Sequence, residues 1–348
     1  MSTNADDTKI PGKRLQLITP DTVTAPAVTE SMSKKSELST TEDILRAVQQ
    51  KDISPEEAVR LADTQGFTLL RDVDVGRPPR ILPSGFAQFD RYSLLKDGEG
   101  ELIILGARPS MGKSGLMFQL ALNVSLQVGP VALFSLEMGN AAIKRRLLSL
   151  TTNTPAKELF SLNPGTFARH ASTRLHGEEM LKLAKLFIYD ESRSAVDNIV
   201  SKARDLNRHE PLRMVVVDYL QIIASRNLGN RNNEIGDVTA GLKGLASELG
   251  CPVIVGSQLN RAVETRAKDP RSGDRGDFRP QLSDLRDSGN IEQDADMVVF
   301  LSRPDYYNPE NRPGEADIRI AKNRNGEVGD FVLNFSKPLT KFWSNETL

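Results

Sequence analysis

The chain has 348 residues, of which 39% are hydrophobic and 26% charged, a composition typical of a globular protein with one large and one small domain. Its formal net charge of -1 restricts any nucleic-acid surface to a local patch, and the 5% aromatic content argues against an extended base-stacking platform. A single cysteine excludes an intrachain disulfide, and the lack of a long apolar run or signal-peptide core predicts a cytoplasmic protein without membrane contact.

The N-terminal part of the chain contains little apolar sequence. Residues 1–40 are rich in Thr, Ser, Pro, Ala and charge without periodicity, so we expect a disordered tail. Residues 41–65 contain two short helical patterns, one starting at Ser54 with Pro55 in the first helical position. Their apolar side chains are too few to fold alone, which predicts a short helical docking or linker segment. Residues 66–82 are expected to be a linker.

From residue 83 to residue 348, apolar runs bounded by turn residues alternate with helical segments. This alternation predicts an α/β domain with a mostly parallel sheet covered by helices. The last two runs, 318–321 and 331–335, have no helix between them and predict an antiparallel hairpin. The other expected strands are residues 102–105, 131–134, 186–189, 214–217, 253–255 and 297–301.

A Gly-Lys-Ser turn follows the first of these strands and precedes a helix-like segment. Backbone N–H groups of small residues and a helix N-terminus bind anions, so this turn predicts a nucleotide site. Lys113 is expected to reach the β- and γ-phosphates, and Ser114 to ligate Mg²⁺. Where the usual G-x-x-x-x-G-K-[ST] pattern begins with glycine, this chain has Ala107. The residues expected to form the site are Ala107, Arg108, Pro109, Ser110, Met111, Gly112, Lys113 and Ser114.

Polar residues follow three further strands: Glu137, Asp218 and Gln258. Active sites of parallel α/β sheets lie at the carboxyl ends of the strands, so we expect these residues to converge with Lys113. Asp218 would hold Mg²⁺, Glu137 would orient or deprotonate the attacking water, and Gln258 would sense the γ-phosphate. Glu137 alone would be better explained as a helix N-cap carboxylate, but three polar strand ends beside a phosphate loop favour catalysis.

Two further cations, Lys322 and Arg324, precede Asn325-Gly326, a strong hairpin-turn signal. Phosphoryl transfer commonly needs an additional cation, often an arginine supplied by a neighbouring subunit. An isolated Lys-x-Arg pair is more often a pair of solvated loop charges, so this assignment depends on the rest of the chain.

Six strings of sequence, taken together, identify a family. They are GARPSMGKS (106–114), FSLEM (134–138), VVVDYLQII (215–223), SQLNRAVETRA (257–267), LSDLRDSGNIEQDADMVVF (282–300) and AKNRNGEVGDF (321–331). In this order and at roughly this spacing, they resemble the replicative DnaB-family hexameric DNA helicases of bacteria and their phages, over residues 83–345. The resemblance implies a RecA-like P-loop ATPase domain, and the family tends to carry alanine at the position of Ala107.

The resemblance implies ATP and Mg²⁺ as cofactors and assigns roles to the site residues. Glu137 matches the family's water-activating glutamate, Asp218 its Mg²⁺-site aspartate and Gln258 the glutamine of its sensor motif. Lys322 and Arg324 match the cations that reach the γ-phosphate bound by the neighbouring subunit.

The resemblance further implies a homo-hexameric ring that binds single-stranded DNA, with a helicase loader or primase as further partner. Arg286, Asp287 and Gly289 match the loop that contacts DNA in the central channel. An arginine in a Gly-containing turn suits phosphate oxygens, although an N-capped helix start explains the string as well. The family's helical N-terminal collar has no room in the 82 residues before the domain, and the arginine-rich 265–280 loop is longer than usual.

Three functions are consistent with these features. The first is an ATP-driven replicative helicase that translocates on single-stranded DNA and unwinds duplex, which the SDLRDSGNIEQDAD and AKNRNG strings favour. The second is a RecA-like recombinase or clock-type ATPase that uses ATP for assembly without unwinding. The third is a non-enzymatic subunit that joins a host helicase ring. The missing collar motivates this third function, whereas Lys113, Glu137, Asp218 and Arg324 argue against it.

Overall fold

The computed structural model describes residues 46, 48–50, 54, 80–191, 194–223, 231–267, 279–285 and 288–345. The chain divides into two units, Met1–Arg77 and Pro78–Leu348. The first unit contains the predicted tail, the docking segment and most of the linker, and these expectations fall almost wholly outside the described residues. The fold below is that of the second unit.

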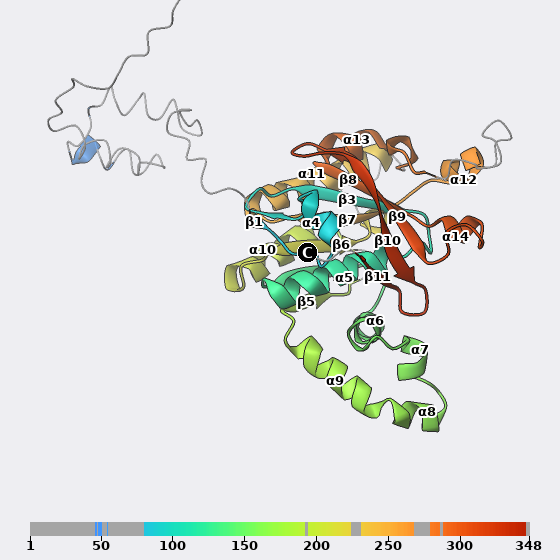
Figure 1. Cartoon of the computed structure of the whole chain (residues 1–348). Coiled ribbons are helices and arrows are strands. Elements are labelled where there is room, and N and C mark those ends of the chain that lie inside the picture. Colours follow the sequence, from blue (N-terminus) through green and yellow to red (C-terminus); the bar gives the residue numbers. More distant parts are fainter. Residues whose placement is uncertain are drawn as a thin grey trace, which may run out of the picture. The chain divides into compact units, whose positions relative to one another are not determined.

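One sheet organises this unit, with the strand order β11-β10-β9-β8-β3-β7-β6-β4-β5 (Figure 1). Neighbouring strands from β8 to β5 run parallel, and β9, β10 and β11 continue the sheet in antiparallel pairing. The strands are β3 (Leu102–Ala107), β4 (Val131–Ser135), β5 (Leu186–Tyr189), β6 (Met214–Asp218), β7 (Val253–Gln258), β8 (Met297–Ser302), β9 (Glu315–Asn323), β10 (Gly329–Ser336) and β11 (Lys341–Trp343).

The prediction of an α/β domain with a mostly parallel sheet and an antiparallel hairpin is confirmed, and every predicted strand is present. Strand β11 and a small antiparallel pair, β1 (Arg80–Ile81) with β2 (Lys96–Asp97), were not predicted. Strand β9 ends at Asn323 and β10 begins at Gly329, so the Asn325-Gly326 pair lies inside a longer connecting loop.

The central strands are continuously apolar because helices cover both of their faces. On β3, Ile103 and Leu105 belong to one core cluster while Leu102 and Ile104 belong to the other, as the alternation of side chains along a strand requires. The first core packs against α4 (Ala87–Arg91), α5 (Lys113–Gln127) and α6 (Asn140–Thr152), and the second against α10 (Val196–His209), α11 (Arg231–Leu249) and α13 (Ser288–Asp294).

The remaining helices lie mainly outside these layers. Helices α7 (Ala156–Leu159), α8 (Pro164–Arg169) and α9 (Ala171–Lys182) extend away from the sheet beyond α6 (Figure 1). The short elements are η2 (Leu220–Ile222), α12 (Ala262–Ala267), η4 (Leu282–Asp284) and α14 (Pro304–Tyr307). Within the described ranges, every helix is too short or too polar to cross a bilayer.

The C-terminal strands are fixed onto the helix that follows the predicted phosphate loop. The amide of Gln119 in α5 is buried, donates to the Phe342 carbonyl (2.8 Å) and accepts from the Phe342 N–H (3.0 Å). This exchange satisfies both polar ends of a buried side chain and holds β11 on α5. It brings a segment remote in sequence to the edge of the site.

Candidate active site

The predicted phosphate loop connects Ala107, the last residue of β3, to Lys113, the first residue of α5. Gly112 precedes the helix with a φ of 102°, in the left-handed region that glycine adopts readily. A Cβ at this position would lie 2.9 Å from the ring of Phe342, so the close approach of β11 also requires glycine. The loop therefore has the strand, turn and helix arrangement that binds phosphate groups at a helix N-terminus.

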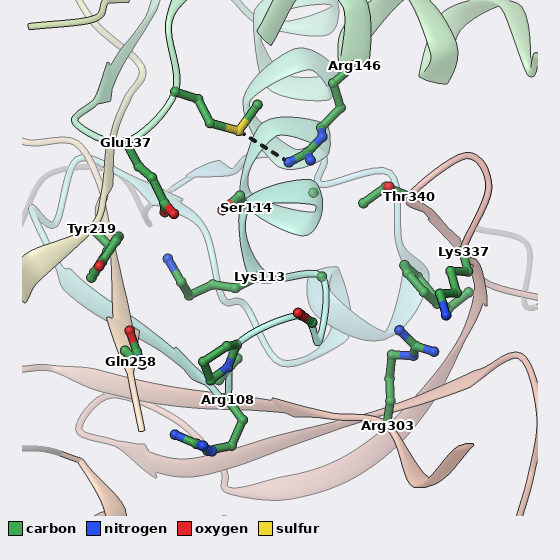
Figure 2. A pocket seen from close by; sticks show the side chains of 17 residues that line it. Arg108, Lys113, Ser114, Glu137, Arg146, Tyr219, Gln258, Arg303, Lys337 and Thr340 are labelled. Atoms are coloured by element: carbon green, nitrogen blue, oxygen red, sulfur yellow. Dashed lines mark hydrogen bonds between the residues drawn. The ribbon is translucent and has the colours of Figure 1, made fainter. Parts of the chain in front are cut away.

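A cavity of about 420 Å³ opens above this loop (Figure 2). Five of its lining side chains are basic and one, Glu137, is acidic, so the cavity favours a polyanionic ligand. The lining residues are Ala107, Arg108, Pro109, Ser110, Gly112, Lys113, Ser114, Gly115, Glu137, Met138, Arg146, Tyr219, Gln258, Arg303, Phe335, Lys337 and Thr340.

Lys113 is held by Asp218, the last residue of β6. The Lys113 ammonium donates to Asp218 Oδ1, and it also lies 4.8 Å from the centre of the Tyr219 ring. Asp218 is fully buried, and its second oxygen, Oδ2, has no hydrogen-bond donor in the described part of the chain. A buried carboxylate oxygen without a donor is costly, and a bound cation would satisfy it.

Gly256 on β7 allows this pair to form. A Cβ there would clash with the Lys113 ammonium and would lie 3.0 Å from Met117 Sδ and 3.1 Å from Asp218 Oδ1. Gly256 is a residue that the sequence reasoning missed, because the VIVGSQ string gives no sign of what lies against its glycine.

Glu137 stands at the carboxyl end of β4, where a tight turn presents it. Ser135 Oγ donates to the Met138 carbonyl (2.8 Å) and accepts from the Met138 N–H (3.2 Å), which closes the turn around Glu137. The Leu136 N–H donates to the Asp218 carbonyl (2.9 Å), so the ends of β4 and β6 are tied together. Figure 2 shows the Glu137 carboxylate and the Lys113 ammonium pointing toward one another across the cavity.

Gln258 also lines the cavity, at the end of β7, and its backbone is fixed by a second glutamine. The Gln221 amide donates to Ser257 Oγ (3.0 Å) and to the Gln258 carbonyl (3.3 Å), and it accepts from the Gln258 N–H (3.1 Å). Tyr219, the residue after Asp218, also lines the cavity. Burial raises the pKa of its hydroxyl, and the charges of Glu137 and Asp218 raise it further. The structure therefore brings Lys113, Ser114, Glu137, Asp218 and Gln258 together at the carboxyl ends of neighbouring parallel strands.

Arg146 on α6 is a basic residue of the cavity that the sequence reasoning missed. Its guanidinium donates to Met138 Sδ (3.5 Å) and lies 5.9 Å from the centre of the Phe118 ring. Burial lowers the pKa of Arg146, and the Asp218 and Glu137 carboxylates oppose that shift. A sulfur atom is a weak acceptor, so an anion in the cavity would be a stronger partner for this guanidinium.

Two residues of the predicted nucleotide loop direct their side chains elsewhere. Arg108 donates to Glu264 Oε1 (2.8 and 2.6 Å) and to the Leu259 carbonyl (2.8 Å), and its guanidinium points away from the other labelled side chains in Figure 2. The Met111 side chain is 1% exposed and belongs to the core. Arg108 thus links the phosphate loop to α12, and the buried Met111 side chain anchors the same loop in the hydrophobic core.

The opposite wall of the cavity comes from the C-terminal part of the sheet (Figure 2). The Arg303 guanidinium lies 4.2 Å from the centre of the Phe335 ring and forms a two-point ion pair with Asp305 (2.8 and 3.1 Å). Lys337 and Thr340, from the turn between β10 and β11, complete this wall. These residues have no motif of their own, so sequence patterns offered no signal for them.

Lys322, in β9, and Arg324, directly after β9, do not line the cavity; their side chains contact the C-terminal end of α13. Lys322 donates to the carbonyls of Glu292 and Ala295, the second at 2.6 Å, and Arg324 donates to the Gln293 carbonyl. Burial lowers the pKa of Lys322, as does the neighbouring Arg324 charge, while Asp296, Glu292 and Asp294 oppose this shift.

The predicted DNA-contact loop is only partly described. Arg286 and Asp287 lie outside the described residues, whereas Gly289 is exposed in the first turn of α13. Most of the arginine-rich 265–280 loop also lies outside the described ranges.

Residues 82–344 match the family model described as "DnaB-like helicase C terminal domain". The chain is 38% identical over 264 residues to the "Probable plasmid replicative DNA helicase" of Chlamydia psittaci, covering 75% of this chain and 55% of that protein. It is 40% identical over 267 residues to the "Replicative DNA helicase DnaB" of Geobacillus stearothermophilus, covering 75% of this chain and 56% of the relative. The chain thus spans about half the length of these curated relatives.

Solved structures give the same relationship. A solved structure described as an "ATPase Domain" superposes with a TM-score of 0.69 at 32% identity, covering 84% of this chain and 99% of that chain. A second structure, described as that of "A DnaB-Like Replicative Helicase And Its Interactions With Primase", gives a TM-score of 0.69 at 30% identity, covering 91% of this chain and 76% of that one. These similarities confirm the predicted RecA-like ATPase fold. The chain therefore belongs to the DnaB family, through its DnaB-like helicase C-terminal domain.

Proposed function

We propose that this chain is the ATP-hydrolysing motor of a ring-shaped helicase that translocates on single-stranded DNA and unwinds duplex. The observation that carries the proposal is the basic cavity above the phosphate loop, which Lys113, Glu137 and Gln258 line and beside which the buried Asp218 bonds to Lys113, at the carboxyl edge of the parallel strands. Family membership supplies the context in which such a cavity drives unwinding.

ATP binds with its phosphates on the 108–114 loop and Lys113. Backbone N–H groups of the loop and the N-terminal end of α5 favour negative charge, and the Lys113 ammonium adds a full positive charge. The adenine ring lies toward the opposite wall, which Arg303, Phe335 and Thr340 help to form.

Mg²⁺ is held by Ser114 and Asp218. Their fit to this ion is supported by the buried Oδ2 oxygen of Asp218, which lacks a donor among the described residues, and by the Ser114 position on the cavity wall. Oxygen ligands of this type suit Mg²⁺. When bound, the ion neutralises charge on the phosphates.

Glu137 acts as the general base for the attacking water. Its carboxylate is exposed to the cavity and faces Lys113, and the Ser135 turn limits its freedom to move. Gln258 contacts the γ-phosphate, and Arg146 supplies a further cation from the same subunit. A preorganised set of charges of this kind accelerates phosphoryl transfer because it stabilises charge that develops in the transition state.

Lys322 and Arg324 act on the nucleotide of the neighbouring subunit. Their position at α13, away from the cavity of their own subunit, supports action in trans. Arg286, Asp287 and Gly289 contact the phosphate backbone of single-stranded DNA in the channel of a homo-hexameric ring. Gly289 is exposed in α13, which leaves its backbone accessible to such a ligand.

The ring is closed in part by residues 41–65 of one subunit, which dock on the α8–α9 region of the next. Large apolar side chains are exposed in and beside these helices, whereas Gly177 is the buried residue of α9. A partner segment that covered them would remove apolar surface from water. The exposed residues are Leu162, Phe167, Leu175, Met180 and Leu183. A primase or a helicase loader is a further partner, in line with the interactions with primase described for the second structural relative.

The test combines three measurements on one sample of the full chain. ATP hydrolysis is measured with and without single-stranded DNA, the mass is determined by light scattering with ATP, and unwinding is followed on a forked duplex with a fluorescent strand. We expect a hexamer, DNA-stimulated hydrolysis and ATP-dependent strand release, with Lys113→Ala as the inactive control.

Each alternative function gives a different result in this test. A DNA-stimulated ATPase that assembles but never releases the strand supports a recombinase or clock-type ATPase. A chain without hydrolysis that incorporates into a ring of a DnaB relative supports a non-enzymatic subunit. Either result refutes the helicase proposal.

A further inference from the structure

The turn that carries Arg324 is anchored on its own subunit by a buried carboxylate, Asp296. This residue is 5% exposed, and its Oδ1 accepts from Arg324 Nη1 (3.2 Å). Its Oδ2 accepts from the Leu102 N–H (2.7 Å) and from Lys243 Nζ (2.7 Å), and its carbonyl accepts from the Arg324 N–H (2.9 Å). Both the backbone and the side chain of Arg324 are thus tied to one residue, which in turn is bonded to the start of β3.

A second buried carboxylate holds the next residue of the same turn. Glu101 is 2% exposed, and its Oε1 accepts from Asn325 Nδ2 (2.9 Å) and from Lys96 Nζ (3.4 Å). Lys96 Nζ also donates to the Asn325 carbonyl (3.5 Å). The turn is therefore held from two sides, by carboxylates that lie next to the first residue of β3.

The third attachment is the C-terminal end of α13. Arg324 and Lys322 donate to the carbonyls of Gln293, Glu292 and Ala295, which are groups that a helix end leaves without an internal partner. Cations at this end also complement the helix dipole. Despite these bonds the Arg324 side chain stays 46% exposed, and a guanidinium has five N–H donors, so donors remain for a second partner.

We propose that Asp296 and Glu101 are positioning residues for Arg324, which they hold ready for the nucleotide of the neighbouring subunit. This inference rests on the proposed function. All six residues of β3 are buried, and the strand runs from these two carboxylates to the subunit's own phosphate loop. The cation that a subunit donates and the loop with which it binds ATP therefore lie at opposite ends of one rigid strand.

Positioning matters here because the guanidinium acts on charge that develops in the transition state, where a misplacement of about 1 Å can lower turnover about 100-fold. A long arginine side chain on an unanchored turn would lose rotamer freedom each time it engaged the neighbour. Anchoring the turn removes much of that loss before the subunits meet, in the way that preorganised groups gain effectiveness.

The test uses two variants that release the turn from different sides. Asp296→Asn keeps an oxygen for the Leu102 N–H but removes the charge that faces Arg324. Asn325→Asp places a carboxylate against Glu101 and keeps an Asx-Gly pair in the turn. Asp330→Asn is the matched control, because it breaks another arginine–carboxylate pair of β9, that with Arg319 (3.8 Å), on a half-exposed surface.

We expect Asp296→Asn and Asn325→Asp to lower kcat of DNA-stimulated hydrolysis about 10- to 100-fold, with unchanged affinity for a fluorescent ATP analogue. Combined with Arg324→Ala, neither variant lowers kcat further, because all three act through the same guanidinium. Asp330→Asn hydrolyses ATP like the wild type.

Other results overturn the inference. Wild-type kcat in Asp296→Asn and Asn325→Asp shows that the anchors do not position Arg324. If a double variant with Arg324→Ala has a lower kcat than Arg324→Ala alone, the anchor acts through the structure and not through Arg324. Weaker nucleotide binding in either anchor variant likewise shows a structural role. If Asp296→Asn does not fold, the exposed Asn325→Asp variant decides the question. A folded wild-type chain without ATP hydrolysis refutes the proposed function itself, which distinguishes that failure from failure of the anchors alone.

Discussion

Replacing Gly256 by alanine adds a single methyl group to the floor of the cavity. The new Cβ would lie 3.0 Å from Met117 Sδ, 3.1 Å from Asp218 Oδ1 and in still closer contact with the Lys113 ammonium. Favourable separations between heavy atoms are about 3.5–4.0 Å, so these neighbours must move apart by several tenths of an ångström or more. The Lys113 ammonium lies at the end of a flexible side chain, so it is displaced first. This displacement moves it away from Asp218 and from the position in which it would contact a phosphate group.

The size of the effect follows from this contact. Overpacking of a well-packed site costs about 1–3 kcal/mol. Because the displaced group is the phosphate-binding lysine, we expect most of this free energy to be lost from nucleotide binding, which corresponds to an affinity about 5- to 150-fold weaker. The remainder lowers the stability of the fold, and for a domain of this size each kcal/mol lowers Tm by about 2–4 °C.

The assay is the affinity for a fluorescent ATP analogue, with Tm measured on the same samples. The matched control is Gly244→Ala, the same substitution in α11 at a position where a Cβ meets no atom within 4 Å. This control should bind nucleotide normally and be slightly more stable, because alanine favours a helix over glycine. If Gly256→Ala binds the analogue as tightly as Gly244→Ala, the packing argument at Lys113 is wrong.

Four further substitutions test the site. Lys113→Ala should abolish hydrolysis and strongly weaken nucleotide binding in the same assay, and wild-type turnover would contradict the site assignment. Glu137→Gln should still bind ATP but hydrolyse it about 10²- to 10⁴-fold more slowly, since it keeps the shape and loses the base; loss of binding as well would point to a structural role. Arg286→Ala, at a position expected from sequence to contact DNA, should weaken single-stranded DNA binding and reduce the stimulated ATPase while basal hydrolysis stays measurable, whereas an unchanged salt dependence of DNA affinity would exclude the contact. Arg324→Ala should lower kcat about 10³- to 10⁵-fold with little change in ATP affinity, and activity recovered in verified mixed hexamers with Lys113→Ala would support action in trans; rapid hydrolysis by a wild-type monomer would refute it.

The sequence alone determined the parallel core and one side of the site. Continuous apolar runs between turn residues located every central strand, because a strand buried on both faces carries apolar residues at nearly every position. Since parallel strands end at the same edge of a sheet, Glu137, Asp218 and Gln258 were predicted to lie near Lys113 before any strand order was known. In the structure Lys113, Glu137 and Gln258 line one cavity, and the buried Asp218 accepts from the Lys113 ammonium beside it.

Only the tertiary structure decided the other side of the site and the details of its packing. Arg303, Phe335 and Thr340 reach the cavity because β9, β10 and β11 fold back beside α5, and Arg146 reaches it from α6.

The need for glycine at position 256 likewise depends on what lies opposite it. Arg108 belongs to the phosphate-loop motif, yet its guanidinium bonds to Glu264, which is 156 residues away in the sequence. Local patterns report which face of an element is buried, but not which distant side chain will meet it. Contacts between remote segments depend on strand order and on the packing of particular side chains, and these are settled only when the whole sheet has assembled.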